Sequence, residues 1–119
     1  MQQPVETAAI HSWHAHIYYD PATTRDVAAV LREWIGARFE VALGRWHDVK
    51  VGPHPQAMYQ VAFGVDVFPS LVPFLSLNRM GLTILVHPET GDEYTDHLHR
   101  ALWFGAVLQL DGSMLKGAP

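Results

Sequence analysis

The sequence predicts an α+β fold in which one antiparallel sheet carries helices on one face. Segments with the two-residue alternation of strands and segments with the three-to-four-residue spacing of helices follow the order strand, helix, strand, strand, helix, strand and a final helix. The strand-like segments are apolar mainly on one side, which is typical of a sheet with one covered face. Because the chain has 119 residues, of which 49% are hydrophobic and 17% charged, we expect residues 1–119 to form one domain, with a loose N-terminal lead-in over 1–9.

The first part of the chain is expected to hold two strands and one helix. Residues 12–19 alternate as a strand, and Asp20 followed by Pro21 is typical of a helix start. Apolar side chains then recur at three- and four-residue spacing, which indicates an amphipathic helix. These side chains are Val27, Val30, Leu31, Trp34, Ile35 and Phe39. A second, less regular strand is expected over 40–49.

The middle of the chain combines a proline-rich loop, a strand and a helix. The sequence Gly-Pro-His-Pro at 52–55 indicates a loop. The segment 58–65 alternates regularly and predicts a third strand. A second helix is expected over 68–78, and Pro73 should bend or shorten it, because proline lacks the backbone N–H that a helix interior uses.

The last part of the chain is expected to contain a fourth strand and a third helix. Residues 82–86 alternate as a strand, and Pro88 is expected to stop it. Thr90 and Glu93 have the spacing of a capping box, which predicts a helix from there to about Phe104. The tail after this helix carries no clear pattern.

This order matches the split βαβ, ferredoxin-like arrangement, βαββαβ, with a C-terminal helix added. The first strand is then central and borders the third and the fourth. One half of the strand residues should lie on the face that the helices leave uncovered. These are His14, His16, Tyr18, Gln60, Ala62, Thr83, Leu85 and His87. We expect a second subunit, another element of the chain or a substrate to cover this face, and a homodimer or higher homo-oligomer is the favoured assembly.

Three histidines of the predicted sheet could bind one metal ion. His14 and His16 are two residues apart on one strand, so their side chains share a face. The ferredoxin-like order brings His87 to the same face from the neighbouring strand. Because the chain has no cysteine, a metal would need imidazole, carboxylate or water ligands, which suit iron, zinc or manganese. The alternative interpretation is that these histidines face solvent or lie in a dimer interface.

Other side chains could complete a site around these histidines. His54 lies between two prolines and is either a turn residue or, because its loop leads into a neighbouring strand, a base or a fourth ligand. His97 and His99 cannot both face the sheet from one helix, and His97 lies nearer the apolar stripe. Tyr18 shares the histidine face of its strand and could contact a substrate ring.

Several other classes of protein are disfavoured by the sequence. The formal net charge of −4 and the lack of a Lys/Arg cluster argue against a nucleic-acid partner. No apolar run approaches the ~20 residues of a membrane span and no signal-peptide pattern opens the chain, so we expect no membrane partner and a cytoplasmic location. The chain also has no Gly-rich phosphate loop, no Gly-x-Ser-x-Gly motif and no dinucleotide fingerprint.

Three blocks of the sequence, and a stretch that continues the third, together resemble the DOPA 4,5-dioxygenase family, over about residues 10–111. They are Trp-His-Ala-His-Ile-Tyr-Tyr-Asp at 13–20, Gly-Pro-His-Pro with Met-Tyr-Gln-Val-Ala-Phe within 52–63, the run from Leu-Asn-Arg-Met to Thr-Gly-Asp at 77–92, and Asp-His at 96–97 with Ala-Leu-Trp-Phe-Gly at 101–105. The resemblance implies a ferredoxin-like domain that opens catechol rings with dioxygen at a non-haem iron. The motif histidines of the family fall on His14, His16, His54, His87 and His97.

The resemblance leads us to expect an extradiol-type dioxygenase that acts on L-DOPA or a related catechol. The expected Fe(II) ligands are His14, His16 and His87. The expected catalytic residues are His54 as acid and base, His97 and Tyr18.

Two points stay open in the sequence. Many ring-cleaving iron sites use two histidines and a carboxylate, so this site is either all-histidine or joined by Asp20, Glu89 or Asp96. The fold also admits a non-catalytic dimer that binds a small molecule on its open sheet face, or a cofactor-free monooxygenase.

Overall fold

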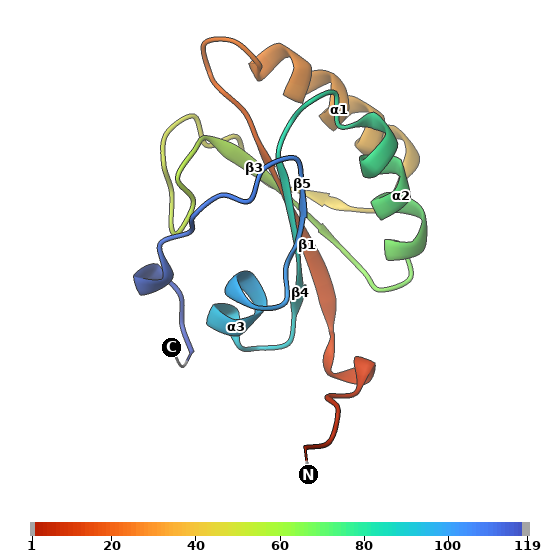
Figure 1. The fold of residues 1–119 in the computed structure, drawn as a ribbon. Coiled ribbons are helices and arrows are strands. Elements are labelled where there is room, and N and C mark those ends of the chain that lie inside the picture. Colours follow the sequence, from red (N-terminus) through yellow and green to blue (C-terminus); the bar gives the residue numbers. More distant parts are fainter. Residues whose placement is uncertain (1, 118–119) are drawn as a thin grey trace.

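A computed structural model describes residues 2–117 and shows one five-stranded antiparallel sheet with the strand order β2-β3-β1-β4-β5 (Figure 1). The strands are β1 (Ser12–Tyr18), β2 (Ala42–Leu43), β3 (Met58–Phe63), β4 (Ile84–Glu89) and β5 (Leu102–Phe104). The helices are α1 (Arg25–Arg38), α2 (Phe68–Asn78) and α3 (Glu93–Leu98), with short 3-10 turns at Thr7–Ala9 and Gly112–Met114. The first four strands and two helices follow the βαββαβ order, so the α+β, ferredoxin-like prediction is confirmed. Within 2–117, no helix has the length and apolar character needed to span a bilayer.

Strand β1 is the centre of the sheet and sets its register. It pairs antiparallel with β3 on one side and with β4 on the other. His14 lies opposite Ala62 of β3 and opposite His87 of β4. Since side chains directly opposite each other share a face, this register confirms that His14 and His87 lie on the same side of the sheet.

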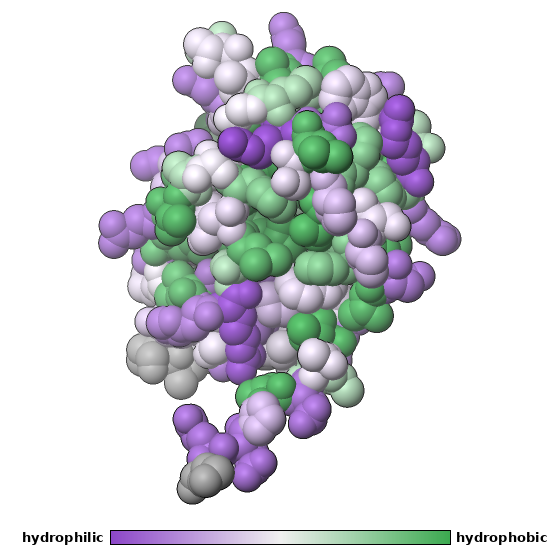
Figure 2. Space-filling model, turned by 45° about the vertical axis from the view of Figure 1, so that its right-hand side comes forward, coloured by the Kyte–Doolittle hydropathy of each residue, from purple (hydrophilic) through white to green (hydrophobic). Residues whose placement is uncertain are grey.

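Helices α1 and α2 cover the other face of the sheet, as Figure 1 shows. The main hydrophobic core lies between these helices and the apolar halves of the strands. Its fully buried members include Ala15, Ile17, Leu31, Ile35, Tyr59, Val61, Leu71, Leu75, Ile84 and Val86. The Tyr59 hydroxyl donates a hydrogen bond of 2.8 Å to the Ala28 carbonyl, which ties α1 to β3. In the view of Figure 2, hydrophobic surface gathers near the middle and many of the hydrophilic side chains lie towards the rim.

The histidine-bearing face is partly covered by α3 and by the chain that follows it. A second apolar cluster is formed there by buried Tyr18, Met58, Leu85 and Leu110. Backbone hydrogen bonds fix this cover, from Asp111 N–H to the Pro53 carbonyl and from Tyr94 N–H to the Lys116 carbonyl. Another element of the chain, one of the three covers expected from the sequence, therefore occupies part of this face. The oligomeric state stays a prediction.

The first helix and second strand differ from the prediction at their bounds. Helix α1 begins at Arg25, because residues 21–24 form a turn in which Asp20 Oδ1 accepts from the Ala22 N–H. The strand expected over 40–49 is reduced to β2 and one isolated bridge, between His47 and Met58. This segment lies at the edge of the sheet, next to β3. Helix α2 has the predicted bounds, and it contains Pro73.

The end of the chain corrects two predictions. Pro88 does not stop β4, which continues to Glu89. Strand β5 pairs with β4 only as far as Val86, so beyond that point β4 is an edge strand, where proline is tolerated. The third helix ends at Leu98 instead of near Phe104, and Leu102–Phe104 pair with β4 as β5. Asp92, rather than Thr90, caps α3 by accepting from the Thr95 N–H.

Replacing Leu110 tests whether the C-terminal segment packs on the sheet. Leu110 is only 8% exposed, so Leu110→Ala should lower the free energy of unfolding by about 2 kcal/mol. The control Val107→Ala, at a position 77% exposed, should change it by less than about 0.5 kcal/mol. Denaturant unfolding followed by circular dichroism measures both values. Equal stability of Leu110→Ala and the unaltered protein would contradict this packing.

Candidate functional site

Five histidines from four parts of the chain meet on the face of the sheet opposite α1 and α2. His14 and His16 come from β1, His87 from β4, His97 from α3, and His54 from the loop before β3. The ring centroids of His16 and His54 are 4.2 Å apart, and those of His87 and His97 are 3.8 Å apart. All are buried except His14, which is partly exposed. The structure thus brings together every histidine singled out in the sequence motifs.

The cluster offers two overlapping groups of three possible metal ligands. In His14, His16 and His87, one ligand atom from each residue lies within 4.8 Å of the other two. The same holds for His16, His54 and His97. The first group is the one predicted from strand alternation. The second depends on how α3 and the 52–55 loop fold onto the sheet. The sequence indicated each of its three histidines as a candidate, but it did not predict that they form one group.

The other histidines do not join the cluster within the part of the chain that the structure describes. His99 is exposed and its ring lies 5.9 Å from that of Tyr94. His11 is exposed ahead of β1, and His47 forms the isolated bridge to Met58 at the start of β3. His97 rather than His99 therefore faces the sheet, as expected.

Hydrogen bonds at Nδ1 determine which nitrogen of two histidines is free. His87 Nδ1 lies 2.9 Å from the Pro88 carbonyl, and His97 Nδ1 lies 2.7 Å from the Glu93 carbonyl. Because a carbonyl only accepts, each Nδ1 carries the proton and donates it. In the neutral ring the lone pair is then on Nε2, which is the usual arrangement of a metal-binding histidine.

His16 has a buried nitrogen without a partner. Its Nε2 lies 3.0 Å from His87 Nε2, which holds a lone pair, so His16 Nε2–H is the donor of this bond. The Nδ1 atom of His16 then also holds a lone pair, and it is buried with no hydrogen-bond partner. A buried unpaired polar atom is costly and calls for an explanation. A cluster of imidazole nitrogens that includes such an atom fits a transition-metal ion such as iron, zinc, copper or nickel.

Burial keeps these imidazoles neutral near neutral pH. Removal from water, reinforced by the neighbouring histidines, lowers the pKa of His87 to about 3 and that of His16 well below its ordinary value. For the same reasons the pKa of His54 falls to about 4. Burial also lowers the pKa values of His14 and His97. Since metals bind the neutral ring, no proton has to leave these groups before a metal can bind near pH 7.

Tyr18 lies on the same face and contacts the cluster through His54. Its hydroxyl is 2.6 Å from His54 Nδ1, and its ring stacks on that of Trp103 at a centroid distance of 6.1 Å. Burial raises the pKa of Tyr18, so the phenol keeps its proton at neutral pH. The pair joins a buried O–H group to an imidazole that faces the other histidines.

The three carboxylates left open by the sequence take different positions. Asp20 is exposed in the turn before α1. Asp96 is fully buried, but its oxygens are taken up by Thr90 and Arg100. Glu89 is the one of the three that contacts a cluster histidine, with Oε1 2.7 Å from His14 Nδ1.

The Glu89–His14 contact is a hydrogen bond from a neutral ring to a carboxylate. Burial lowers the pKa of His14 and raises that of Glu89, and neither direction favours a fully charged pair. Both side chains are 24% exposed, so this is the part of the cluster nearest to solvent.

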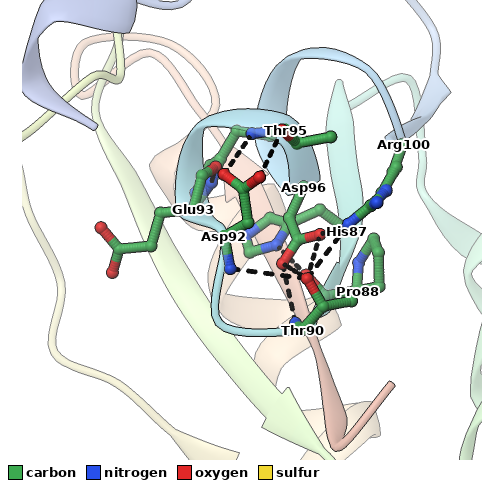
Figure 3. A network of polar contacts seen from close by, with 9 residues as sticks. His87, Pro88, Thr90, Asp92, Glu93, Thr95, Asp96 and Arg100 are labelled. Carbon is green, nitrogen blue, oxygen red and sulfur yellow. Dashed lines mark hydrogen bonds and ion pairs between the residues drawn. The ribbon is translucent and has the colours of Figure 1, made fainter. Parts of the chain in front are cut away.

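Asp96 positions the helix that carries His97 (Figure 3). Its carboxylate accepts from the Thr90 N–H at 2.7 Å and from Arg100 Nη1 at 3.0 Å. This partly buried network joins the end of β4 to α3, and Figure 3 shows it beside His87. The sequence pointed to Asp96 only as a candidate carboxylate ligand and did not reveal this role, which depends on Thr90 and Arg100 folding towards it.

The fold and the cluster together define a class, that of small ferredoxin-like domains with a buried site of histidines able to hold a metal. The family model described as the Dopa 4,5-dioxygenase family matches residues 13–114. The chain therefore belongs to the Dopa 4,5-dioxygenase family, as the sequence blocks indicated, and this membership supports an oxygenase activity.

Individual proteins are also similar to this chain. A DOPA 4,5-dioxygenase of Amanita muscaria is 35% identical over 92% of this chain and 51% of its own length. An uncharacterized 21.2 kDa protein of Botryotinia fuckeliana is 34% identical over 96% of this chain and 68% of its own length. The chain thus spans about half the length of the Amanita enzyme and two thirds of the other relative. The crystal structure of a Nostoc punctiforme protein described as a candidate dioxygenase is 56% identical, with a TM-score of 0.91 over 93% of this chain and 96% of that one.

Replacing Asp96 should loosen α3. Asp96→Ala leaves Arg100 and the Thr90 N–H without their buried acceptor, so we expect the free energy of unfolding to fall by about 2–3 kcal/mol. The control Asp66→Ala, at an exposed position, should cost less than about 0.5 kcal/mol. Urea unfolding of both variants measures the difference. A harmless Asp96→Ala would show that the network does not hold the helix.

Acid should destabilise the metal-free protein. An unfolded histidine has a pKa near 6.5, whereas those of His54 and His87 are lowered to about 4 and about 3 in the fold. Below pH ~6.5 the unfolded chain therefore binds more protons, and stability falls as the pH falls from there towards about 4. Unfolding midpoints between about pH 7.5 and about pH 4.5 test this.

Two variants separate the cluster from other acid effects. His54→Gln should flatten the pH dependence, whereas His99→Gln, at an exposed position, should leave it as it is. Equal or greater stability of the unaltered protein at the acid end would contradict the prediction.

Proposed function

We propose that this protein is an extradiol-type ring-cleaving dioxygenase that uses O2 and a histidine-bound non-haem Fe(II) to open L-DOPA or a related catechol. The observation that carries the proposal is the convergence of five histidines, four of them buried, on one face of the sheet. Family membership supports the reaction class. The donor set itself suits several metals, so the choice of iron rests on the resemblance to catechol-cleaving enzymes.

We assign the metal to His14, His16 and His87. His87 lies directly opposite His14 on the adjacent strand, and His16 follows two residues after His14, so the sheet itself fixes their spacing. When bound, Fe(II) supplies a centre that can take up the two catechol oxygens and activate dioxygen. The rigid strands hold the three ligands before substrate arrives. Binding of both reactants at one centre would then remove much of the entropy cost of bringing them together.

His54, His97 and Tyr18 are proposed as the catalytic residues around the substrate. A catechol has to lose protons to chelate a metal, and His54 is neutral and able to accept one. The Tyr18 hydroxyl lies 2.6 Å from His54 Nδ1 and orients that ring. Because a hydroxyl can donate to the Nδ1 lone pair or accept from Nδ1–H, this bond is kept in both protonation states of His54. His97 is held by the Glu93 carbonyl and lies against His87, where it can hydrogen-bond an oxygen of the substrate.

Substrate is proposed to enter beside His14. This residue is the most exposed member of the cluster, whereas His16, His54, His87 and His97 are each no more than 8% exposed. We expect a small planar ring to approach the cluster from this partly exposed side. The physiological partners proposed are therefore a catechol and O2.

Turnover of L-DOPA tests the proposed function directly. Protein loaded with Fe(II) without oxygen and then mixed with L-DOPA and air should consume O2 and form a yellow ring-opened product. Elemental analysis should find stoichiometric iron. Protein that retains no metal would favour a non-catalytic binding domain, and turnover that resists chelators would favour cofactor-free chemistry.

Two histidine variants separate metal binding from proton transfer. His16→Ala should lose both iron retention and turnover, because His16 belongs to both ligand groups. His54→Gln should keep the iron and lose on the order of 10²–10⁴ in kcat, the usual contribution of an acid–base group. His99→Ala is the control and should leave both unchanged. Full iron content in His16→Ala would refute its role as a ligand.

A further inference from the structure

Glu89 differs from every other partner of the cluster. His87 and His97 donate Nδ1–H to backbone carbonyls, and His54 Nδ1 bonds a phenol. His14 Nδ1 instead meets a carboxylate oxygen, at 2.7 Å. In the part of the chain that the structure describes, no hydrogen bond or ion pair joins a second carboxylate side chain to any of these five histidines.

The sheet holds Glu89 in this place. Two residues after His87 on the same strand, it lies on the same face, and Ser12 of β1 is its partner in the register. The backbone around it is anchored, because the Glu89 carbonyl accepts from the His11 N–H at 2.9 Å. Glu89 is thus a diagonal neighbour of His14, within reach of a long side chain.

We propose that Glu89 is a positioning residue of the histidine site, which holds His14 in the tautomer with the proton on Nδ1 and the lone pair on Nε2. A carboxylate only accepts, so it selects this tautomer in the neutral ring. It also makes the ring a stronger donor to a metal and brings one negative charge to a site otherwise built of neutral ligands. The tautomer of His14 does not depend on the proposed function. Only the effect of Glu89 on metal affinity rests on the proposed function.

Glu89 acts through His14 rather than as a ligand itself. Its Oε1 is taken up by His14 Nδ1, and neither of the two ligand groups includes Glu89. Glu93 offers a comparison, because its charge also acts on His14 while its side chain is exposed and points away from the network around it in Figure 3. Replacing Glu93 removes a nearby charge without breaking the bond to His14.

The first measurement is the tautomer of His14 in metal-free protein, from ¹⁵N chemical shifts of the ring nitrogens at neutral pH. The unaltered protein should show a protonated Nδ1 and an unprotonated Nε2. Glu89→Ala should move the proton to Nε2. Glu89→Gln, whose amide oxygen still accepts, should keep it on Nδ1, and so should the control Glu93→Gln.

The second measurement is the affinity for Zn²⁺, a diamagnetic ion that binds imidazole and leaves the NMR readout usable. Glu89→Ala should weaken Zn²⁺ binding about 10–100-fold, the usual effect of losing such an outer partner. Glu89→Gln should lose less than Glu89→Ala, and Glu93→Gln less again.

Three results would overturn the proposal. They are a Glu89→Ala protein that keeps the proton on His14 Nδ1, one that binds Zn²⁺ as tightly as the unaltered protein, and loss of all binding in Glu89→Gln, which would make Glu89 a ligand. If the unaltered protein binds neither Zn²⁺ nor Fe(II), the proposed function fails, and the tautomer measurement still decides the role of Glu89.

Discussion

The antiparallel register between β1 and β4 is the constraint on which the site depends. It sets His14 directly opposite His87 and places His16 beside Leu85 on the same face. A slip of one residue would send every side chain of one strand to the opposite face. The apolar halves of both strands oppose such a slip, because Ile17, Ile84 and Val86 would then leave the core under α1 and α2. The hydrophobic core and the histidine cluster are therefore specified by the same pairing.

Strand-borne features of the site could be predicted from the sequence alone. Alternation along β1 predicted the shared face of His14, His16 and Tyr18, and the βαββαβ order predicted His87 beside them. These inferences hold because a two-residue period and a small set of topologies leave few alternatives. The apolar stripe of α1 was predictable for the same reason, since it has to face the sheet.

Features that depend on long-range contacts could not be predicted. The capping pattern at Thr90 and Glu93 predicted a helix, but Thr90 bonds Asp96 instead, and the chain turns back to pair Leu102–Phe104 with β4. Pro88 was expected to stop β4, but it lies beyond Val86, where β5 no longer pairs with this strand. That position is a property of the whole sheet, so the neighbouring sequence could not reveal it. The role of Asp96 was hidden in the same way.

The loop that carries His54 is anchored differently from the strands. Its backbone is held at Pro53 by the N–H of Asp111, a residue near the far end of the chain. The rings of His14, His87 and His97 are oriented by a carboxylate or a carbonyl of β4 or α3, and His16 bonds His87. Because Tyr94 of α3 is also hydrogen-bonded to this segment, at the Lys116 carbonyl, a displacement of the C-terminal segment would act on His54 and on the helix that carries His97. It would leave the three strand-borne imidazoles in place, so the two parts of the cluster differ in how independently they can move.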